Sequence, residues 1–258
     1  MKLSSLITIC IVIILYIHVI FELKTSNEMD VYELEMDTRR LEEICNYKQP
    51  VVINYDARPC IPSQLTESIM VYDTYHNGVP LSIDKANDLF KGKGYGTYQN
   101  NLTDSMHLFL PTDIILRPPM CVMTRYDIMF GSEGYTTRLQ YSTANRTYLV
   151  VSQGSITVKL APSITPLDKT LDYETHEVVS SINPWTEKKA FLEMTIGTGR
   201  MLFVPAYWWN SIRLEKDACV CVFQYRTCMN VLSTLPNFGI DFLQQCNTIT
   251  KIFPRVST

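Results

Sequence analysis

The chain has 258 residues, a length that suits one large domain with an appendage. Hydrophobic residues make up 46% of it, including 15 Tyr and 10 Phe, which favours an aromatic-rich β core and argues against disorder. The formal net charge is −3, and the basic residues form no run longer than a pair, as at Lys188-Lys189, which disfavours a nucleic-acid-binding surface.

The first segment, Leu3–Phe21, contains no charged residue, and its 19 positions are enough to cross a hydrocarbon core of roughly 30 Å as a helix. No A-x-A-like cleavage site follows Phe21, so we favour an uncleaved signal anchor over residues 1–24 and keep a cleaved signal peptide as the alternative. Lys2 precedes the span and acidic residues follow it. This asymmetry predicts a cytoplasmic N-terminus and a lumenal or extracellular C-terminal domain.

Seven cysteines lie outside this span, and none has zinc-finger spacing. The odd number predicts neither a complete disulfide framework nor a zinc ribbon. Cys219 and Cys221 are two apart on a predicted strand, so we expect buried thiols on one face. Two glycosylation acceptor patterns begin at Asn101 and Asn145, as expected for a glycoprotein with a lumenal domain.

The next part of the chain mixes helical and strand patterns. Helical spacing of apolar residues over 29–45 predicts an amphipathic helix in a stalk at 25–48, and residues 49–55 predict a buried strand. Further along we expect a strand at 71–75, a short helix at 83–89 capped by Ser82, a glycine-rich turn at 92–98, and a loop after 113–119.

Strands dominate from Thr136 onward. The predicted strands are 137–141, 147–152, 155–160, 193–196, 201–204, 210–214 and 218–225. The tail from Thr227 has helical spacing, broken by Pro236 and Gly239 into at least two pieces. These patterns divide the chain into a β domain at 49–225 and a helical segment at 226–258.

One run, Gly199–Leu214 (GRMLFVPAYWWNSIRL), carries a family signature. It resembles the barrel-closing strand pair of the JmjC/cupin-type 2-oxoglutarate oxygenases, in the asparaginyl-hydroxylase-like branch. There a G-x-x-L-[FY]-[IV]-P-x-x-W-W run is followed directly by the distal iron-ligand histidine, a position that Asn210 occupies here. The resemblance covers roughly residues 40–250. It implies a mainly β fold: a double-stranded β-helix (cupin or jelly-roll barrel) with flanking helices, preceded by one transmembrane helix.

The first two ligands of that family come from an H-x-D or H-x-E pair on one strand, because positions two apart share a face. Matching the context Gly134–Ser142 puts Gln140 at the histidine position and Ser142 at the acid position. No His, Asp or Glu occurs from Thr136 to Lys159, so a register slip changes nothing. The family's co-substrate lysine is also absent near Ser155, and Lys159 should face elsewhere.

Neutral amide and hydroxyl oxygens are weak ligands for Fe(II). The resemblance therefore implies a degenerate iron site at Gln140, Ser142 and Asn210, with no metal, no cofactor and no catalytic residue. A replacement set, Asp172, Glu174 and His176, would share a face if extended, but a solvated polar loop is the simpler interpretation. His107 has no recognisable acid–base partner.

The sequence thus predicts a membrane-anchored, cupin-like pseudoenzyme that acts as a binding or structural module. It resembles the membrane-anchored cupin-like proteins of large DNA viruses. The alternatives are an oxygenase or other metalloenzyme with atypical ligands, and a lectin-like binder that uses Tyr207, Trp208 and Trp209 at the barrel mouth. In related oxygenases the C-terminal helices form a dimer. The apolar residues available for that here are Val231, Leu232, Leu235, Phe238, Ile240, Phe242 and Leu243.

Overall fold

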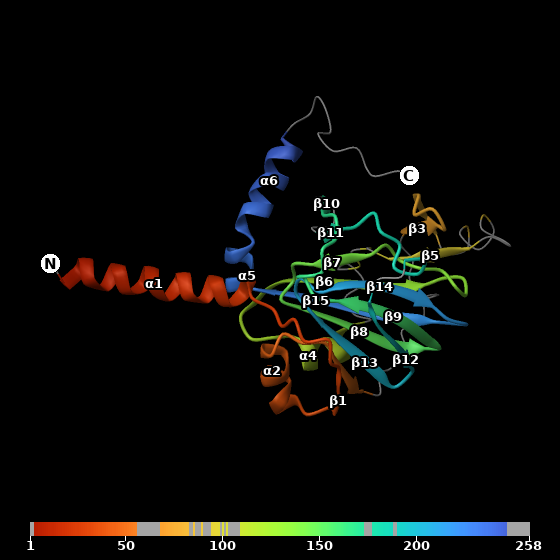
Figure 1. Cartoon of the computed structure of the whole chain (residues 1–258), viewed down its shortest axis with the longest axis horizontal. Coiled ribbons are helices and arrows are strands. Elements are labelled where there is room, and N and C mark those ends of the chain that lie inside the picture. Colours follow the sequence, from red (N-terminus) through yellow and green to blue (C-terminus); the bar gives the residue numbers. More distant parts are fainter. Residues whose placement is uncertain are drawn as a thin grey trace.

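The computed structural model describes residues 3–55, 68–82, 85, 89, 94–98, 100, 102, 109–172, 177–187 and 190–246. The protein is mainly β, with one long N-terminal helix, α1 (Leu3–Leu23), that projects away from the sheets (Figure 1). The predicted fold class is confirmed at this level. The predicted short helix at 83–89 falls largely on residues outside the described part of the chain.

Most strands belong to two six-stranded sheets. In spatial order the first sheet holds β1 (Tyr32–Glu35), β2 (Val51–Asn54), β13 (Arg200–Pro205), β8 (Arg146–Gln153), β15 (Cys219–Thr227) and β6 (Cys121–Phe130). The second holds β10 (Thr170–Asp172), β11 (Glu177–Val179), β7 (Gln140–Ser142), β14 (Trp209–Leu214), β9 (Ser155–Ala161) and β12 (Leu192–Gly197). Both sheets are open, and β4 (Gly78–Leu81), β3 (Ile69–Asp73) and β5 (Tyr95–Thr97) form a smaller third sheet.

The two large sheets share one hydrophobic core, to which both contribute alternate residues. Its buried members include Leu149 and Val151 of β8, Ile156, Val158 and Leu160 of β9, Leu202 of β13, Ile212 of β14, and Val220 of β15. β8 is buried along almost its whole length, because helices cover its other face. The pattern that predicted strands at 147–152 and 155–160 is confirmed.

The outer face of the first sheet carries α2 (Thr38–Asn46) and α4 (Leu110–Leu116). The predicted amphipathic helix over 29–45 is wrong in its first half, where Tyr32–Glu35 form β1 instead. β1 pairs in parallel with β2, and this pairing satisfies backbone groups that a helix would have satisfied internally. Glu33 also forms a 3.1 Å ion pair with Arg200 of β13.

α4 ends at Leu116, within the segment 113–119, and the region predicted as a loop after this segment forms the strand β6. Asp113 of α4 is 3% exposed, and it accepts hydrogen bonds from the hydroxyls of Tyr126 (2.7 Å) and Tyr225 (2.9 Å). Arg117 adds an ion pair at 2.7 Å. This buried carboxylate therefore ties α4 to β6 and β15. The predicted turn at 92–98 likewise contains a strand, β5.

The tail forms two helices, α5 (Cys228–Ser233) and α6 (Leu235–Gln245). Thr227 caps α5 by accepting a hydrogen bond from the backbone of Asn230. Two helices were predicted, but the break lies at Thr234 and not at Pro236 or Gly239. Proline is tolerated in the first turn of α6, where its missing N–H has no partner to lose.

The C-terminal end of α1 is attached to the β domain. Asn145 donates a hydrogen bond to Glu22 (2.9 Å), and the indole of Trp208 donates one to Thr25 (3.1 Å). The ammonium of Lys48 lies 4.2 Å from the ring centroid of Phe21 and also donates to the Phe21 carbonyl. Within α1 no residue is buried, and the helix is long and apolar enough to span a membrane.

The cysteines of β15 differ in state. Cys219 and Cys221 both belong to the core on the outer face of the first sheet, so the predicted shared face is confirmed. Cys221, however, is disulfide-bonded, which corrects the expectation of two buried thiols. The other described cysteines, Cys10, Cys45, Cys121, Cys219, Cys228 and Cys246, are free.

Candidate functional site: a polar pocket between the two sheets

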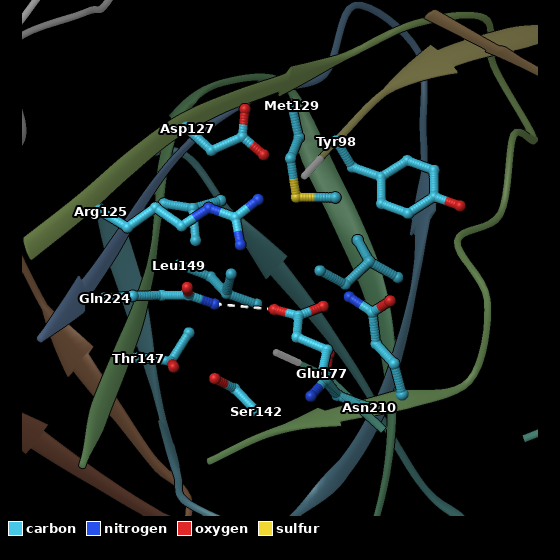
Figure 2. Close-up of a pocket in the computed structure, with 13 residues that line it drawn as sticks. Tyr98, Arg125, Asp127, Met129, Ser142, Thr147, Leu149, Glu177, Asn210 and Gln224 are labelled. Atoms are coloured by element: carbon cyan, nitrogen blue, oxygen red, sulfur yellow. Dashed lines mark hydrogen bonds between the residues drawn. The ribbon is translucent and has the colours of Figure 1, made fainter. Parts of the chain in front are cut away.

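A polar pocket interrupts the apolar core between the two large sheets (Figure 2). Its volume is about 40 Å³, room for roughly three ordered waters or one small polar group. The lining side chains come from both sheets: Tyr98, Arg125, Asp127, Met129, Gln140, Ser142, Thr147, Leu149, Glu177, Asn210, Ile212, Val222 and Gln224. Most of them are polar, in contrast to the aliphatic residues further along the same strands.

All three positions expected for iron ligands line this one pocket. Asn210 of β14 stands directly opposite Gln140 of β7 in the strand register, and Ser142 follows two residues later on the same face. The residues between them, Tyr141 and Trp209, point to the opposite face and pack there in a separate core. The geometry thus gathers Gln140, Ser142 and Asn210 around one volume, with amide and hydroxyl groups in place of imidazole and carboxylate.

The pocket also contains a carboxylate that the sequence analysis missed. Glu177 of β11 lies opposite Ser142 in the register and is only 4% exposed. It accepts a 3.0 Å hydrogen bond from the amide of Gln224, which belongs to the other sheet (Figure 2). This contact links the two sheets across the pocket. In the sequence, Glu177 directly follows a run of polar residues that was interpreted as a solvated loop, so no alternating pattern identified it as a strand residue.

The opposite wall of the pocket is formed by β6, which carries Arg125 and Asp127 on one face. Asp127 is 6% exposed and accepts a hydrogen bond from the backbone N–H of Ile128 at 2.8 Å. Arg125 donates through Nε to the carbonyl of Asn100 at 3.4 Å. A signal for this wall exists in the sequence, because these two charged residues alternate with the buried Tyr126 and Ile128.

This set of side chains is suited to hydrogen bonding. Among the described residues, the lining offers amides, hydroxyls, two carboxylates and one guanidinium. In the described part of the chain, no three His, Cys, Asp or Glu side chains lie close enough together to hold a metal ion. Oxygen donors of this kind suit a small polar ligand that makes several hydrogen bonds.

Of the replacement metal ligands considered from the sequence, only Asp172 belongs to the part of the chain that the structure describes. Asp172 ends β10 and pairs with Glu177 in the register of β10 and β11, so the segment around it forms a short hairpin. Glu174 and His176 lie outside the described residues, as do His107 and Asn101. Asn145, the second glycosylation candidate, is half-buried, and its amide nitrogen is engaged with Glu22. A glycan on that nitrogen would displace this contact.

The aromatic run before Asn210 does not form a binding platform. Trp208 and Trp209 are both fully buried, and a ring without exposed surface cannot stack on a sugar. Trp209 packs edge-on against Tyr141 with ring centroids 4.7 Å apart, on the face of the sheet that points away from the pocket. Tyr207 is half-buried, and burial raises the pKa of its hydroxyl to about 12. The burial of Trp208 and Trp209 therefore argues against the alternative of a glycan site at these residues.

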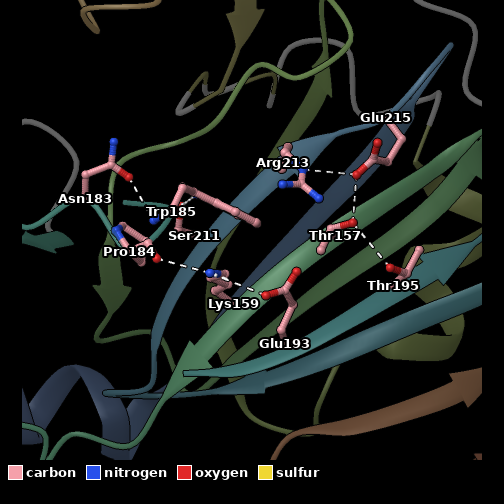
Figure 3. Close-up of polar contacts among 10 residues, drawn as sticks. All are labelled: Thr157, Lys159, Asn183, Pro184, Trp185, Glu193, Thr195, Ser211, Arg213 and Glu215. Carbon is pink, nitrogen blue, oxygen red and sulfur yellow. Dashed lines mark hydrogen bonds and ion pairs between the residues drawn. The ribbon is translucent and has the colours of Figure 1, made fainter. Parts of the chain in front are cut away.

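Lys159 faces away from the pocket, as expected from strand alternation (Figure 3). It forms an ion pair with Glu193 (3.4 Å) and donates to the carbonyl of Pro184 (3.1 Å). The ring centroid of Trp185 lies 4.9 Å from the Lys159 ammonium and 4.6 Å from the Arg213 guanidinium, and the indole N–H donates to Ser211 at 2.8 Å. The Asn183–Trp185 loop is thus held on the outer face of the second sheet.

A second hollow, open and about 370 Å³ in volume, lies between β1 and the edge strand β12. Its charged side chains include Glu33 and Arg200, which pair with each other, and Glu193, which pairs with Lys159. Because Glu33, Arg200 and Glu193 already have charged partners, the hollow has a weaker claim to be a binding site than the polar pocket between the sheets.

Comparison of the chain with protein-family models gives no match, and comparison with curated proteins gives none either. Any statement about function therefore depends on the pocket, on the surface of the molecule, and on the motif resemblance already described.

Proposed function

We propose that this chain is a membrane-anchored, cupin-like binding module with a degenerate iron site and no oxygenase activity. One observation carries the proposal: Gln140, Ser142 and Asn210, the positions matched to the iron ligands, line one pocket. Residues assigned from two separate motifs converge there, which is expected if the motifs were matched correctly. The side chains that meet favour a hydrogen-bonded polar ligand over Fe(II).

The strand order supports a jelly-roll interpretation of the two sheets. Successive strands β6, β7, β8 and β9 alternate between the first and the second sheet, and so do β12, β13, β14 and β15. The first and last of these eight strands, β6 and β15, are neighbours, as are β7 and β14. This is the order of two interlocked Greek keys, on which cupins are built.

The membrane anchor and its orientation belong to the same proposal. α1 has 21 residues and is therefore about 32 Å long, which matches the hydrocarbon core of a bilayer. A disulfide at Cys221 fits an oxidising compartment, because cytosolic thiols are kept reduced. The length of α1 supports the anchor, and the disulfide supports a domain on the lumenal or extracellular side.

The test of the pocket is metal and co-substrate binding. We expect the full chain in lipid nanodiscs to contain no stoichiometric metal and to show no change in melting temperature with Fe(II) or Mn(II) plus 2-oxoglutarate. A ligand that binds only the native state at 100 times its Kd would stabilise it by about 2.7 kcal/mol. For a domain of this size such stabilisation would raise the melting temperature by roughly 5–11 °C, well within the reach of calorimetry.

The opposite result would favour the second candidate, a metalloenzyme with atypical ligands. Glu177 is the carboxylate beside the expected ligand positions, so Glu177→Gln would then abolish the co-substrate-dependent shift. The matched control is Glu193→Gln on the outer face of the second sheet, which leaves the pocket intact.

The orientation is tested at the disulfide. In protein made through the secretory pathway and digested without reduction, we expect the peptide that carries Cys221 to be joined to another cysteine peptide. Recovery of Cys221 as an unmodified thiol would argue for a cytoplasmic domain. Glycosylation of Asn145 is a poor reporter, because its amide is already engaged.

A further inference from the structure

Helix α6 exposes more apolar surface than a short surface helix normally does. Leu235 is 55% exposed, Phe242 65% and Leu243 68%, and Ile240 adds a fourth side chain at 44%. Each of these side chains would be more stable if it were buried away from water. A contiguous group of this kind marks a surface that meets another apolar phase.

The position of α6 along the membrane normal follows from its neighbours. α5 packs against the C-terminal end of α1, where Val19 and Glu22 become half-buried. Only Thr234 separates α5 from α6, so α6 starts at the same level along the membrane normal as the C-terminal end of α1. A helix of 21 residues that crosses the hydrocarbon core has its last turn at the headgroups. Figure 1 shows α6 running crosswise to α1 from this junction, without turning back over the sheets.

Contacts with the β domain fix both the C-terminal end of α1 and the helix α6. The hydrogen bonds from Asn145 to Glu22 and from Trp208 to Thr25 fix the end of α1 to the β domain. The guanidinium of Arg226, at the end of β15, lies 5.5 Å from the ring centroid of Phe238 and ties α6 to the same domain. The domain and α6 are therefore positioned together at the membrane exit.

We infer that α6 lies in the headgroup region of the bilayer that α1 crosses, with Phe242, Leu243 and their apolar neighbours among the upper acyl chains. This inference rests on the proposed membrane anchor. Interfacial helices of this kind place an apolar face into the boundary between headgroups and chains, with polar residues such as Asn237 toward water. The lipid surface would add a second attachment beside α1 and limit tilting of the β domain.

A second copy of the chain is the competing occupant of this surface, as the resemblance to dimeric oxygenases suggests. Stable protein interfaces bury about 800 Å² on each partner. Four side chains on one 11-residue helix provide only a small part of that area. Lipid requires no matching surface and already lies beside α5 if α1 is an anchor. The bilayer is therefore the better-supported occupant.

The test places a tryptophan on α6 in the full-length chain, reconstituted in phosphatidylcholine vesicles with bromine on the acyl chains near the headgroup. Phe242→Trp should show a blue-shifted emission and lose intensity to the brominated lipid, beyond the quenching of the unsubstituted protein. Tyr75→Trp is the matched control, since Tyr75 is 71% exposed and follows β3 at the far end of the domain from α1 (Figure 1). It should show neither effect.

Three results would overturn the inference. In the first, neither Phe242→Trp nor a second variant, Leu243→Trp, is quenched, although the protein stays with the vesicles through carbonate washing. This result would show that α6 is not in the membrane, and it would leave the anchor proposal intact. Crosslinking of two copies through the exposed Cys246 together with a lack of quenching would assign the surface to a dimer. Release of the unsubstituted protein by carbonate would show that α1 is no anchor, and both proposals would fall.

Discussion

Trp209→Ala should lower the free energy of unfolding by about 3–5 kcal/mol, the usual effect of removing a fully buried aromatic side chain. The ring has no exposed surface and packs against Tyr141, Leu139, Ala161 and Val178 on the outer face of the second sheet. For a domain of this size the melting temperature should fall by about 6–20 °C. Thermal unfolding of the full chain in nanodiscs, followed by near-ultraviolet circular dichroism, measures this effect.

The controls separate packing from binding. Trp209→Phe keeps an aromatic ring in the same space and should recover most of the lost stability. Asn210→Ala, at the next position but facing the pocket, removes little apolar contact and should change the melting temperature much less. If Trp209→Ala melted with the parent protein and lost only the affinity for a glycan, the burial of this ring would be contradicted.

Rebuilding the iron site should create a metal-binding protein. The variant with Gln140→His, Ser142→Asp and Asn210→His places two imidazoles and a carboxylate around the pocket, the ligand set of a facial iron triad. Because Gln140 and Asn210 are register partners and Ser142 shares their face, all three new side chains should reach one ion. We expect one equivalent of Co(II) per chain, observed by its visible absorption, and stabilisation of about 2.7 kcal/mol at 100 times the Kd.

A matched variant keeps the two histidines and changes Ser142 to Ala, so that it lacks the carboxylate. It should bind Co(II) more weakly, since an oxygen ligand has been lost. A triple variant that folds with the parent's circular dichroism yet binds no metal would show that these positions do not converge as proposed. That outcome would also remove the main support for a degenerate cupin site.

Several elements could be predicted from local pattern alone. The strands at 147–152, 155–160, 201–204, 210–214 and 218–225 are confirmed because their apolar or alternating residues already specify which face is buried. β1, β10 and β11 could not be predicted in the same way. Each has only three or four residues, and its stability comes from pairing with β2 or β7, a partner that local sequence does not reveal.

Only some of the residues that line the pocket could be predicted from the sequence. Gln140, Ser142 and Asn210 were located through the resemblance, and they do line one volume. Glu177 and Gln224 were missed, because a carboxylate and an amide on strands 47 residues apart have no pattern in common until the sheets stack. Asp127 was missed for a simpler reason: the alternation of β6 was overlooked in a segment taken for a loop.

The sequence by itself determined that the chain has an apolar N-terminal helix, a β-rich core, and amides and a hydroxyl at the matched ligand positions. These properties depend on residue type and on spacing along one element. The tertiary structure decided that Trp208 and Trp209 are interior packing, that Glu177 lines the pocket and bonds Gln224 across it, and that α6 leaves the domain beside the end of α1. Each of these depends on contacts between elements distant in the chain, and only the folded arrangement of the sheets sets those contacts.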